Sequence, residues 1–147
     1  MRQESPELYG HTQFGAVVVA ALAIGLVLCV LIGVSTGWPW PLFILLAWVA
    51  LLFFLFRSLS TVVTSEHLHI FYGPGVISKT IPRQDILGSR LGRTGPFLGW
   101  GIRYWPGRGW TWNISGFDVV VLDLPGDRQF RVGTDDPEGL LDALRGP

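Results

Sequence analysis

The sequence predicts a membrane protein in which an α-helical hairpin is followed by a mainly-β domain. Residues 14–56 contain no Asp, Glu, Lys, Arg or His. One helix crosses a bilayer with about 20 residues, so this apolar run is long enough for two crossings. Beyond residue 57 the chain changes to short alternating runs divided by Gly, Pro and Asp, which is typical of strands joined by turns. An apolar stripe at helical spacing near the C-terminus predicts one further helix.

These patterns divide the chain into three parts. They are an N-terminal tail over residues 1–13, a two-helix transmembrane hairpin over residues 14–57, and a β domain over residues 58–147. The domain has about 90 residues, which is enough for one hydrophobic core. The single cysteine excludes a disulfide framework within the chain.

The hairpin is predicted to consist of a first span over residues 14–34 and a second over residues 40–56. Pro39 and Pro41 lie between the spans and disfavour continuation of the first helix. A cleaved signal peptide is the alternative for the first span, but the acidic tail and the long apolar segment favour a retained helix. Arg57 follows the second span directly. The positive-inside rule therefore predicts a multi-pass protein of the cytoplasmic membrane with both termini in the cytoplasm.

Short segments with the composition of strands follow the hairpin. They are residues 59–64, 68–72, 76–81, 86–91, 101–105, 110–114, 119–124 and 129–132. Gly73-Pro74-Gly75 is a predicted turn, and residues 106–109 and 125–127 are predicted hairpin turns. Seven or eight strands at this spacing predict an antiparallel sandwich or barrel.

The last predicted element is an amphipathic helix that begins near Asp135. Asp135 and Glu138 have the spacing of a capping box, and Gly146 is a suitable end. Three leucines share one face of this helix: Leu140, Leu141 and Leu144. We expect the helix to cover one end of the β-structure, because its apolar stripe has to be buried.

The net charge of the chain is zero, but the charges are unevenly placed. Residues 57–108 hold seven Lys or Arg and two acidic residues, whereas residues 109–147 hold three Arg and seven acidic residues. The basic half is suited to anionic lipid at a membrane surface. The alternative is that the two halves complement each other across the domain surface. Nothing in the charge pattern points to nucleic acid.

Arginines and tryptophans supply the candidate binding residues. Four arginines are candidates for a basic patch, because the guanidinium group contacts phosphate and carboxylate groups with two hydrogen bonds; ordinary solvated surface is the alternative. An aromatic cluster of Phe97, Tyr104 and four tryptophans is suited to the core, the membrane interface or a protein contact, and Trp110 and Trp112 are expected to share one strand face. The candidate lipid or partner contacts are Arg90, Arg93, Trp100, Arg103, Trp105, Arg108 and Trp110.

No catalytic set stands out in the sequence, and neither a cofactor nor a metal is expected. His67 and His69 alternate onto one face of a predicted strand. Two histidines at this spacing can ligate a metal, but no third ligand lies at a convincing distance along the chain. The sequence thus favours a protein that binds rather than an enzyme.

Three segments carry a resemblance to a known family: residues 99–104 (GWGIRY), 109–116 (GWTWNISG) and 132–138 (VGTDDPE). Together with the order of elements, they resemble the bacterial pleckstrin-homology-like (PH-like) membrane proteins, in which a two-helix hairpin precedes the domain. The resemblance implies a bent antiparallel sheet of seven strands capped by a helix, and a binding or scaffolding role. Residues 59–72 hold no Lys or Arg, so the inositol-phosphate binding of eukaryotic PH domains is not implied.

The function that the sequence favours is a non-enzymatic one. A membrane-anchored PH-like domain docks another membrane protein at the cytoplasmic face of the membrane. The alternative is a surface module that binds anionic lipid headgroups through the arginines and tryptophans.

Overall fold

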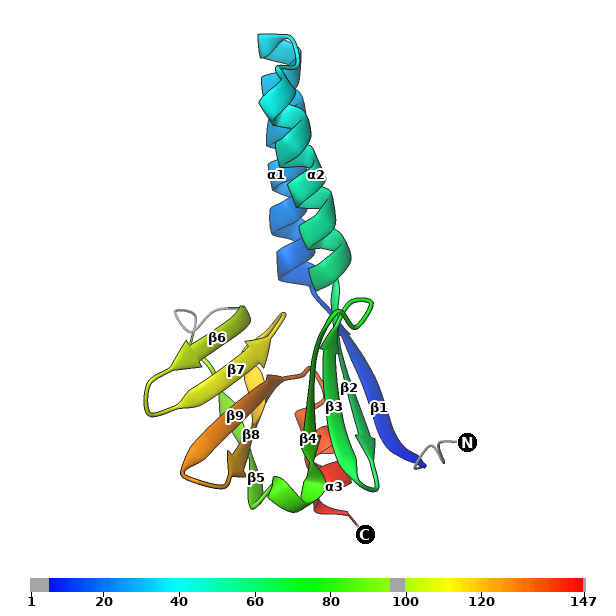
Figure 1. Ribbon diagram of the computed structural model, residues 1–147, viewed down its shortest axis with the longest axis vertical. Coiled ribbons are helices and arrows are strands. Elements are labelled where there is room, and N and C mark those ends of the chain that lie inside the picture. The colour runs from blue at the N-terminus through cyan, green and yellow to red at the C-terminus, as the bar shows by residue number, and fades with distance from the viewer. Residues whose placement is uncertain (1–5, 96–99, 147) are drawn as a thin grey trace.

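The computed structural model describes residues 6–95 and 100–146. These residues form two apolar helices, nine strands in two sheets and a C-terminal helix (Figure 1). The helices are α1 (Ala16–Thr36), α2 (Trp40–Phe56) and α3 (Pro137–Arg145). The strands are β1 (Glu7–Phe14), β2 (Ser58–Thr64), β3 (His67–Tyr72), β4 (Ile77–Pro82), β5 (Gly88–Arg93), β6 (Gly101–Trp105), β7 (Gly109–Asn113), β8 (Asp118–Leu124) and β9 (Arg128–Gly133).

Helices α1 and α2 pack against each other as a hairpin that projects from the β domain (Figure 1). Gly37 ends α1 with a φ of 80°, a left-handed conformation that suits glycine. The proline at 39 caps α2 in an extended conformation, and Pro41 lies in its first turn. Helix α1 has 21 residues, and in the described part of the chain it is the one helix long and apolar enough to cross a membrane. Helix α2 is shorter, with 17 residues, and its bounds are those predicted.

The first sheet is an antiparallel meander in the order β1-β2-β3-β4. The sequence assigns residues 1–13 to a tail, but Glu7–Phe14 form strand β1 and pair with β2 along its length. Helix α1 consequently starts at Ala16 rather than at the predicted residue 14. Strand β1 lacks an apolar alternation, and only Gln13 within it is buried. Its conformation is therefore set by pairing with a strand that follows the hairpin, and local composition does not reveal it.

The second sheet has the order β5-β8-β9-β7-β6. The hairpins β6–β7 and β8–β9 are antiparallel and confirm the two predicted turns between their strands. Strands β7 and β9 pair in parallel, with Thr111 opposite Arg131. The two sheets are thus mostly antiparallel, as predicted, although β1 adds a strand and one pairing is parallel.

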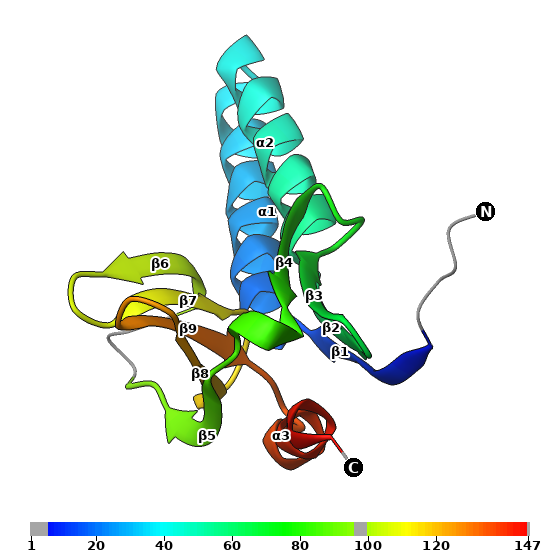
Figure 2. The same cartoon turned by 60° about the horizontal axis from the view of Figure 1, so that its bottom comes forward.

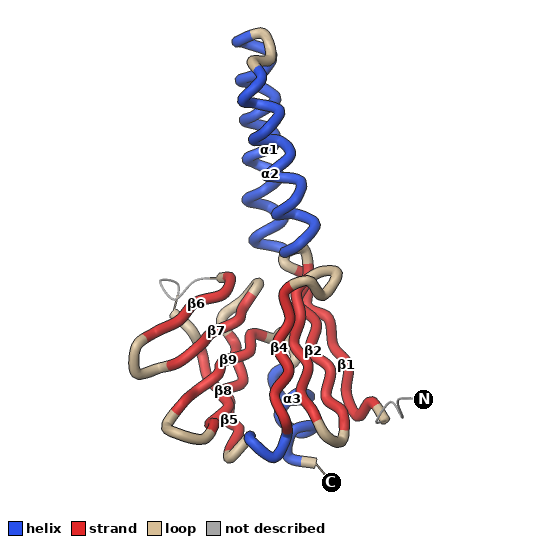
Figure 3. The backbone as a smooth tube through the Cα atoms, viewed as in Figure 1, coloured by secondary structure: helices blue, strands red, loops and turns tan. Residues whose placement is uncertain are grey.

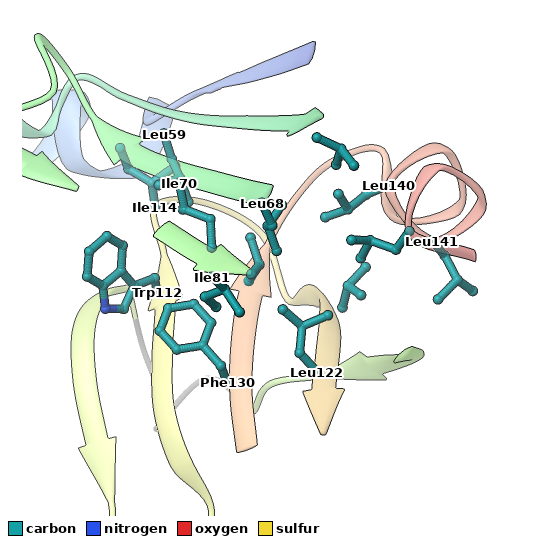
Figure 4. Packing of buried hydrophobic residues seen from close by; sticks show 14 of the residues in the cluster. Leu59, Leu68, Ile70, Ile81, Trp112, Ile114, Leu122, Phe130, Leu140 and Leu141 are labelled. Carbon is teal, nitrogen blue, oxygen red and sulfur yellow. The ribbon is translucent and has the colours of Figure 1, made fainter. Parts of the chain in front are cut away.

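The hydrophobic core lies between the two sheets, and α3 closes one side of it (Figures 2 and 4). Helix α3 contacts β1 and β2 of the first sheet and β5 and β8 of the second. The predicted leucine stripe is buried in this core: Leu140, Leu141 and Leu144. The cap differs from the prediction, because the Gly139 amide donates to a carboxylate oxygen of Asp136 at 3.1 Å. The neighbouring Asp135 instead contacts His11 of β1.

A line of aromatic rings connects the hairpin with the far sheet. The ring of Phe56, at the end of α2, lies 5.2 Å from that of Tyr72. Tyr72 lies 5.5 Å from Trp112, and Trp112 lies 5.7 Å from Phe130, measured between ring centroids. Tyr72 is 1% exposed. The base of the hairpin is therefore continuous with the core of the domain.

The hairpin is inserted between two neighbouring strands of one sheet (Figure 3). Gly15 is the only residue between β1 and α1, and Arg57 is the only residue between α2 and β2. The Gly15 amide donates to the Arg57 carbonyl at 2.9 Å, which closes the base of the hairpin. A Cβ atom on Gly15 would lie 2.8 Å from the Ile114 side chain, so glycine permits this close approach.

Candidate docking surface

Three arginines form one row across the second sheet. The register places Arg90 of β5 opposite Val121 of β8, and Val121 opposite Arg131 of β9. Arg131 lies opposite Thr111 of β7, which lies opposite Arg103 of β6. Residues that are directly opposite in a sheet share a face. Arg90, Arg131 and Arg103, here called the arginine row, therefore lie on one face of this sheet.

This face is the one directed away from the core. The residues next to the row in sequence, such as Leu122, Phe130 and Trp112, point into the core, and successive side chains of a strand alternate between faces. Val121 and Thr111 lie between the arginines and are 5% and 3% exposed. Burial of this kind is expected beneath long arginine side chains, whose apolar stems cover neighbouring groups.

Arg131 occupies the centre of the row and is held in place. Its Nη1 donates to the Arg108 carbonyl at 2.8 Å, and its Nη2 donates to Oε1 of Gln129 at 2.9 Å. The pKa of Arg131 is lowered from its ordinary value, first by burial and then by the nearby positive charges of Arg108 and Arg90; Asp123 opposes the shift. The guanidinium stays charged at neutral pH in any protein environment. The lowered pKa thus reflects mainly the burial of Arg131, with a smaller effect from the positive charges of Arg108 and Arg90.

The candidate arginines differ in their acidic partners. Arg90 forms an ion pair with Asp123 on β8. Arg93 lies three residues further along β5, on the opposite face, and pairs with Asp118 at 3.1 Å. Arg103 and Arg108 are exposed, and the described residues give neither of them an acidic side chain within ion-pair distance. The uncompensated charge therefore gathers at the β6–β7 end of the row.

The candidate tryptophans are distributed over several places. Trp105 follows Arg103 by two residues on β6 and therefore shares its face of the strand. Trp110 and Trp112 share the other face, which confirms the alternation predicted for them, but only Trp112 belongs to the core. Trp110 is 47% exposed, and its ring lies 5.2 Å from that of Tyr104 on the paired strand. The predicted aromatic cluster is thus divided between the core and two surfaces.

Trp100 lies apart from the other tryptophans, beside the loop between β7 and β8. Its Nε1 donates to the Gly116 carbonyl at 3.1 Å, and its ring lies 6.0 Å from that of Phe117. Phe97, which the sequence groups with these residues, lies outside the described residues.

His67 and His69 lie on one face of β3, as the sequence predicts, with ring centroids 5.7 Å apart. His69 contacts the Thr80 hydroxyl at 2.9 Å. Among residues 6–95 and 100–146, no group of three or more His, Cys, Asp or Glu side chains is arranged to hold a metal ion.

Sequence reasoning does not identify Arg131 as a candidate. The alternation of Phe130, Arg131 and Val132 is a signal that Arg131 points away from the core. Its position beside Arg103 depends on the parallel pairing of β7 with β9, which no local pattern indicates. The spacing of three residues between Arg90 and Arg93, by contrast, is enough to place them on opposite faces of a strand.

The structure thus places Arg90, Arg131 and Arg103 on a single sheet face, with Asp123 paired to Arg90. Arg108 lies in the adjoining β6–β7 turn, where its carbonyl accepts a hydrogen bond from Arg131. Guanidinium groups in this arrangement are suited to carboxylate or phosphate oxygens, which they contact with paired hydrogen bonds. Comparison with known proteins finds no matching family model, no matching curated protein and no matching solved structure.

Proposed function

We propose that this chain is a non-enzymatic membrane protein whose hairpin anchors a PH-like docking domain at the cytoplasmic face of the membrane. The anchor is supported by the length and composition of α1 and by the wholly apolar α2 packed against it. At 1.5 Å per residue the two helices are about 31 and 26 Å long, close to the thickness of the hydrocarbon core. Arg57 at the base of α2 supports a cytoplasmic domain.

The PH-like assignment is supported by the order of elements. A four-stranded antiparallel meander is followed by a second sheet and a C-terminal helix that closes one side of the core. Two features depart from the expected pattern. The membrane hairpin interrupts the β1–β2 connection. In chain order, the β6–β7 hairpin is added after β5 and before β8, and it pairs at the far edge of the sheet, beyond β9.

The docking function is carried by the arginine row together with Arg108 in the adjoining β6–β7 turn. An acidic segment of another membrane protein is the partner that this surface fits, because its carboxylates complement Arg103 and Arg108, which lack acidic neighbours among the described residues. Trp105 beside them adds an exposed aromatic ring. Tryptophan and arginine are the residues most often found as anchors of protein interfaces.

Anionic lipid headgroups are the second candidate ligand, because the same guanidinium groups bind phosphate. Arg131 and Arg90, in the middle and at the far end of the row, favour the protein partner. In Figure 1, β6 and β7 lie at the level closest to the base of the hairpin, which the end of β7 approaches, and β5 lies lower (Figures 1 and 2), so Arg90 lies farther than Arg103 from the proposed plane of the membrane. A flat bilayer would meet only the β6 end of the row.

The docking proposal is tested with the full chain in nanodiscs of neutral lipid. A fluorescent oligoglutamate peptide is titrated against the native chain, and binding is expected to weaken as salt rises, because salt screens exposed charges. The Arg103→Gln/Arg108→Gln variant is expected to lose most of this binding. Its control is Arg93→Gln/Arg128→Gln, which removes the same charge away from the arginine row and is expected to bind as the native chain does.

Two other outcomes would contradict docking of a protein at this surface. Binding to separate anionic vesicles that depends on Arg103 and Arg108, without binding to the peptide, would favour the headgroup reader. Equal losses in the two double variants would show that only overall charge matters and would reject the arginine row as a docking site.

A further inference from the structure

Two contacts fix the geometry at the base of the hairpin. The first is the hydrogen bond between the Gly15 amide and the Arg57 carbonyl. The second is the turn between β3 and β4, where the Gly73 amide donates to the Ser58 carbonyl at 2.9 Å. A Cβ atom on Gly73 would lie 2.7 Å from the carbonyl oxygens of Phe54 and Leu55 in the last turn of α2. These contacts fix one end of the domain directly beneath the hairpin.

Two exposed apolar side chains lie at this end of the domain. Val76, in the same turn as Gly73, is 74% exposed, and Phe117 in the β7–β8 loop is 37% exposed. The β3–β4 turn lies beside the base of α2 (Figure 1). The β7–β8 loop is placed at the base of α1 by Ile114, which the short link at Gly15 approaches.

The β7–β8 loop is braced from three directions. Gln13 of β1 donates from Nε2 to the Ser115 carbonyl at 2.9 Å, and Asn113 donates from Nδ2 to the Gly116 carbonyl at 3.1 Å. The Thr94 amide donates to the Phe117 carbonyl at 2.7 Å. Asn113 is fully buried. A loop held this firmly presents Phe117 in one position, with the Trp100 ring against it.

We propose that this end of the domain lies in the headgroup layer of the membrane, with Val76 and Phe117 in contact with lipid. The inference rests on the proposed function of the hairpin as a membrane anchor. Lipid is the occupant because the hairpin enters the bilayer one residue from the domain on each side, so the headgroups are the material that surrounds its base. Arg57 at the same level has its guanidinium over the Phe54 ring, 5.8 Å from the centroid. Cationic and aromatic side chains of this kind are favoured where a helix leaves the hydrocarbon.

The test places an environment-sensitive fluorophore on single cysteines of the full chain in vesicles, in a Cys29→Ala background. Val76→Cys and Phe117→Cys report on the proposed contact, and Ser65→Cys in the exposed β2–β3 turn, at the opposite end of β3, is the matched control. Ile24→Cys, exposed on α1, reports on insertion of the hairpin. Lipids carrying a quencher near the headgroup are expected to remove most of the fluorescence at residues 76 and 117 and to leave that at residue 65 unchanged.

Quenching at residue 24 by lipids labelled deep in the acyl chain separates the two proposals. If residue 24 is quenched while residues 76 and 117 are not, the hairpin is inserted but the domain stands off the membrane, and the inference is overturned. Equal quenching at residues 65, 76 and 117 also overturns it, because both ends of the domain would then contact the membrane to the same extent. Absence of quenching at residue 24 rejects the membrane anchor itself.

Discussion

At the scale of single residues, two features of position 73 require glycine: a positive φ and close contact with the backbone of α2. Its φ is +46°, and a Cβ atom there would meet two carbonyl oxygens of α2. Gly75 in the same turn has a φ of +89°, but the nearest atom to a Cβ there is 3.9 Å away. Left-handed backbone costs a residue with a side chain about 1–2 kcal/mol, and forcing atoms into a packed site costs about 1–3 kcal/mol more.

We therefore expect Gly75→Ala to lower the free energy of unfolding by the backbone cost alone, and Gly73→Ala to lower it further. Thermal unfolding of the two variants in detergent measures the difference. An equal decrease in the free energy of unfolding for both variants would mean that the β3–β4 turn does not pack against α2.

Two tyrosines predict how stability depends on alkaline pH. Burial raises the pKa of Tyr72, and burial together with the hydrogen bond to Asp136 raises the pKa of Tyr9. A raised folded-state pKa gives stability that is complete below the pKa of the unfolded chain, about 10 for tyrosine, and is lost as pH rises from there toward the folded-state pKa. We expect the free energy of unfolding to fall above pH 10 or so, by up to about 1.4 kcal/mol per pH unit from Tyr72 and by less from Tyr9, which is only partly buried.

Denaturant unfolding over a pH series checks this dependence. Tyr72→Phe and Tyr9→Phe are each expected to reduce the alkaline slope, with the larger reduction from Tyr72→Phe. An unchanged slope in both variants would contradict the assignment.

At the scale of elements, β1 decides whether the domain is complete. It pairs with β2 from Glu7 to Phe14, and its Tyr9 hydroxyl donates to a carboxylate oxygen of Asp136 at 2.9 Å. Phe14 lies directly opposite Ser58, so a two-residue Asn-Gly turn can replace residues 15–57 as an ordinary hairpin connection.

We expect the chain with this turn to give a soluble, folded domain that unfolds cooperatively. Residues 58–147 alone are expected to lose the cooperative transition, because β2 then has an open edge and α3 loses its contacts with β1. Circular dichroism during heating distinguishes the two proteins. A cooperative transition of equal midpoint in both would show that β1 is dispensable.

A helix or strand can be predicted from the sequence when neighbouring residues determine it, and cannot when it depends on contacts with distant segments. The bounds of α2 can be read from composition, because an apolar run between Pro39 and Arg57 needs no distant partner. The strands of the two confirmed hairpins carry their own alternation and turns. Strand β1 and the parallel β7–β9 pairing arise from contacts between segments distant in the chain, so the position of Arg131 in the arginine row was not accessible from sequence.

At the scale of the whole molecule, two one-residue links and the Gly15–Arg57 hydrogen bond join the hairpin to the domain. Inserting Gly-Ser-Gly-Ser after Arg57 separates α2 from β2 and removes the register of the Gly15–Arg57 hydrogen bond. We expect a fluorophore at residue 76 to lose its contact with headgroup-labelled lipid in this variant, while one at residue 24 remains quenched by deep labels. The same insertion after Gly107, in the exposed β6–β7 turn, is the control and should leave both signals unchanged. Retained quenching at residue 76 after the first insertion would show that the short links do not hold the domain in place.

The insertion of the hairpin between β1 and β2 also has a consequence for biogenesis. Strand β1 is synthesised before the hairpin and its partner β2 after it. If only one of the two helices crossed the bilayer, these strands would end in different compartments and the first sheet would never form. If the hairpin spans the membrane as proposed, the pairing of β1 with β2 therefore excludes a chain in which a single helix has crossed, because such a chain cannot close the first sheet.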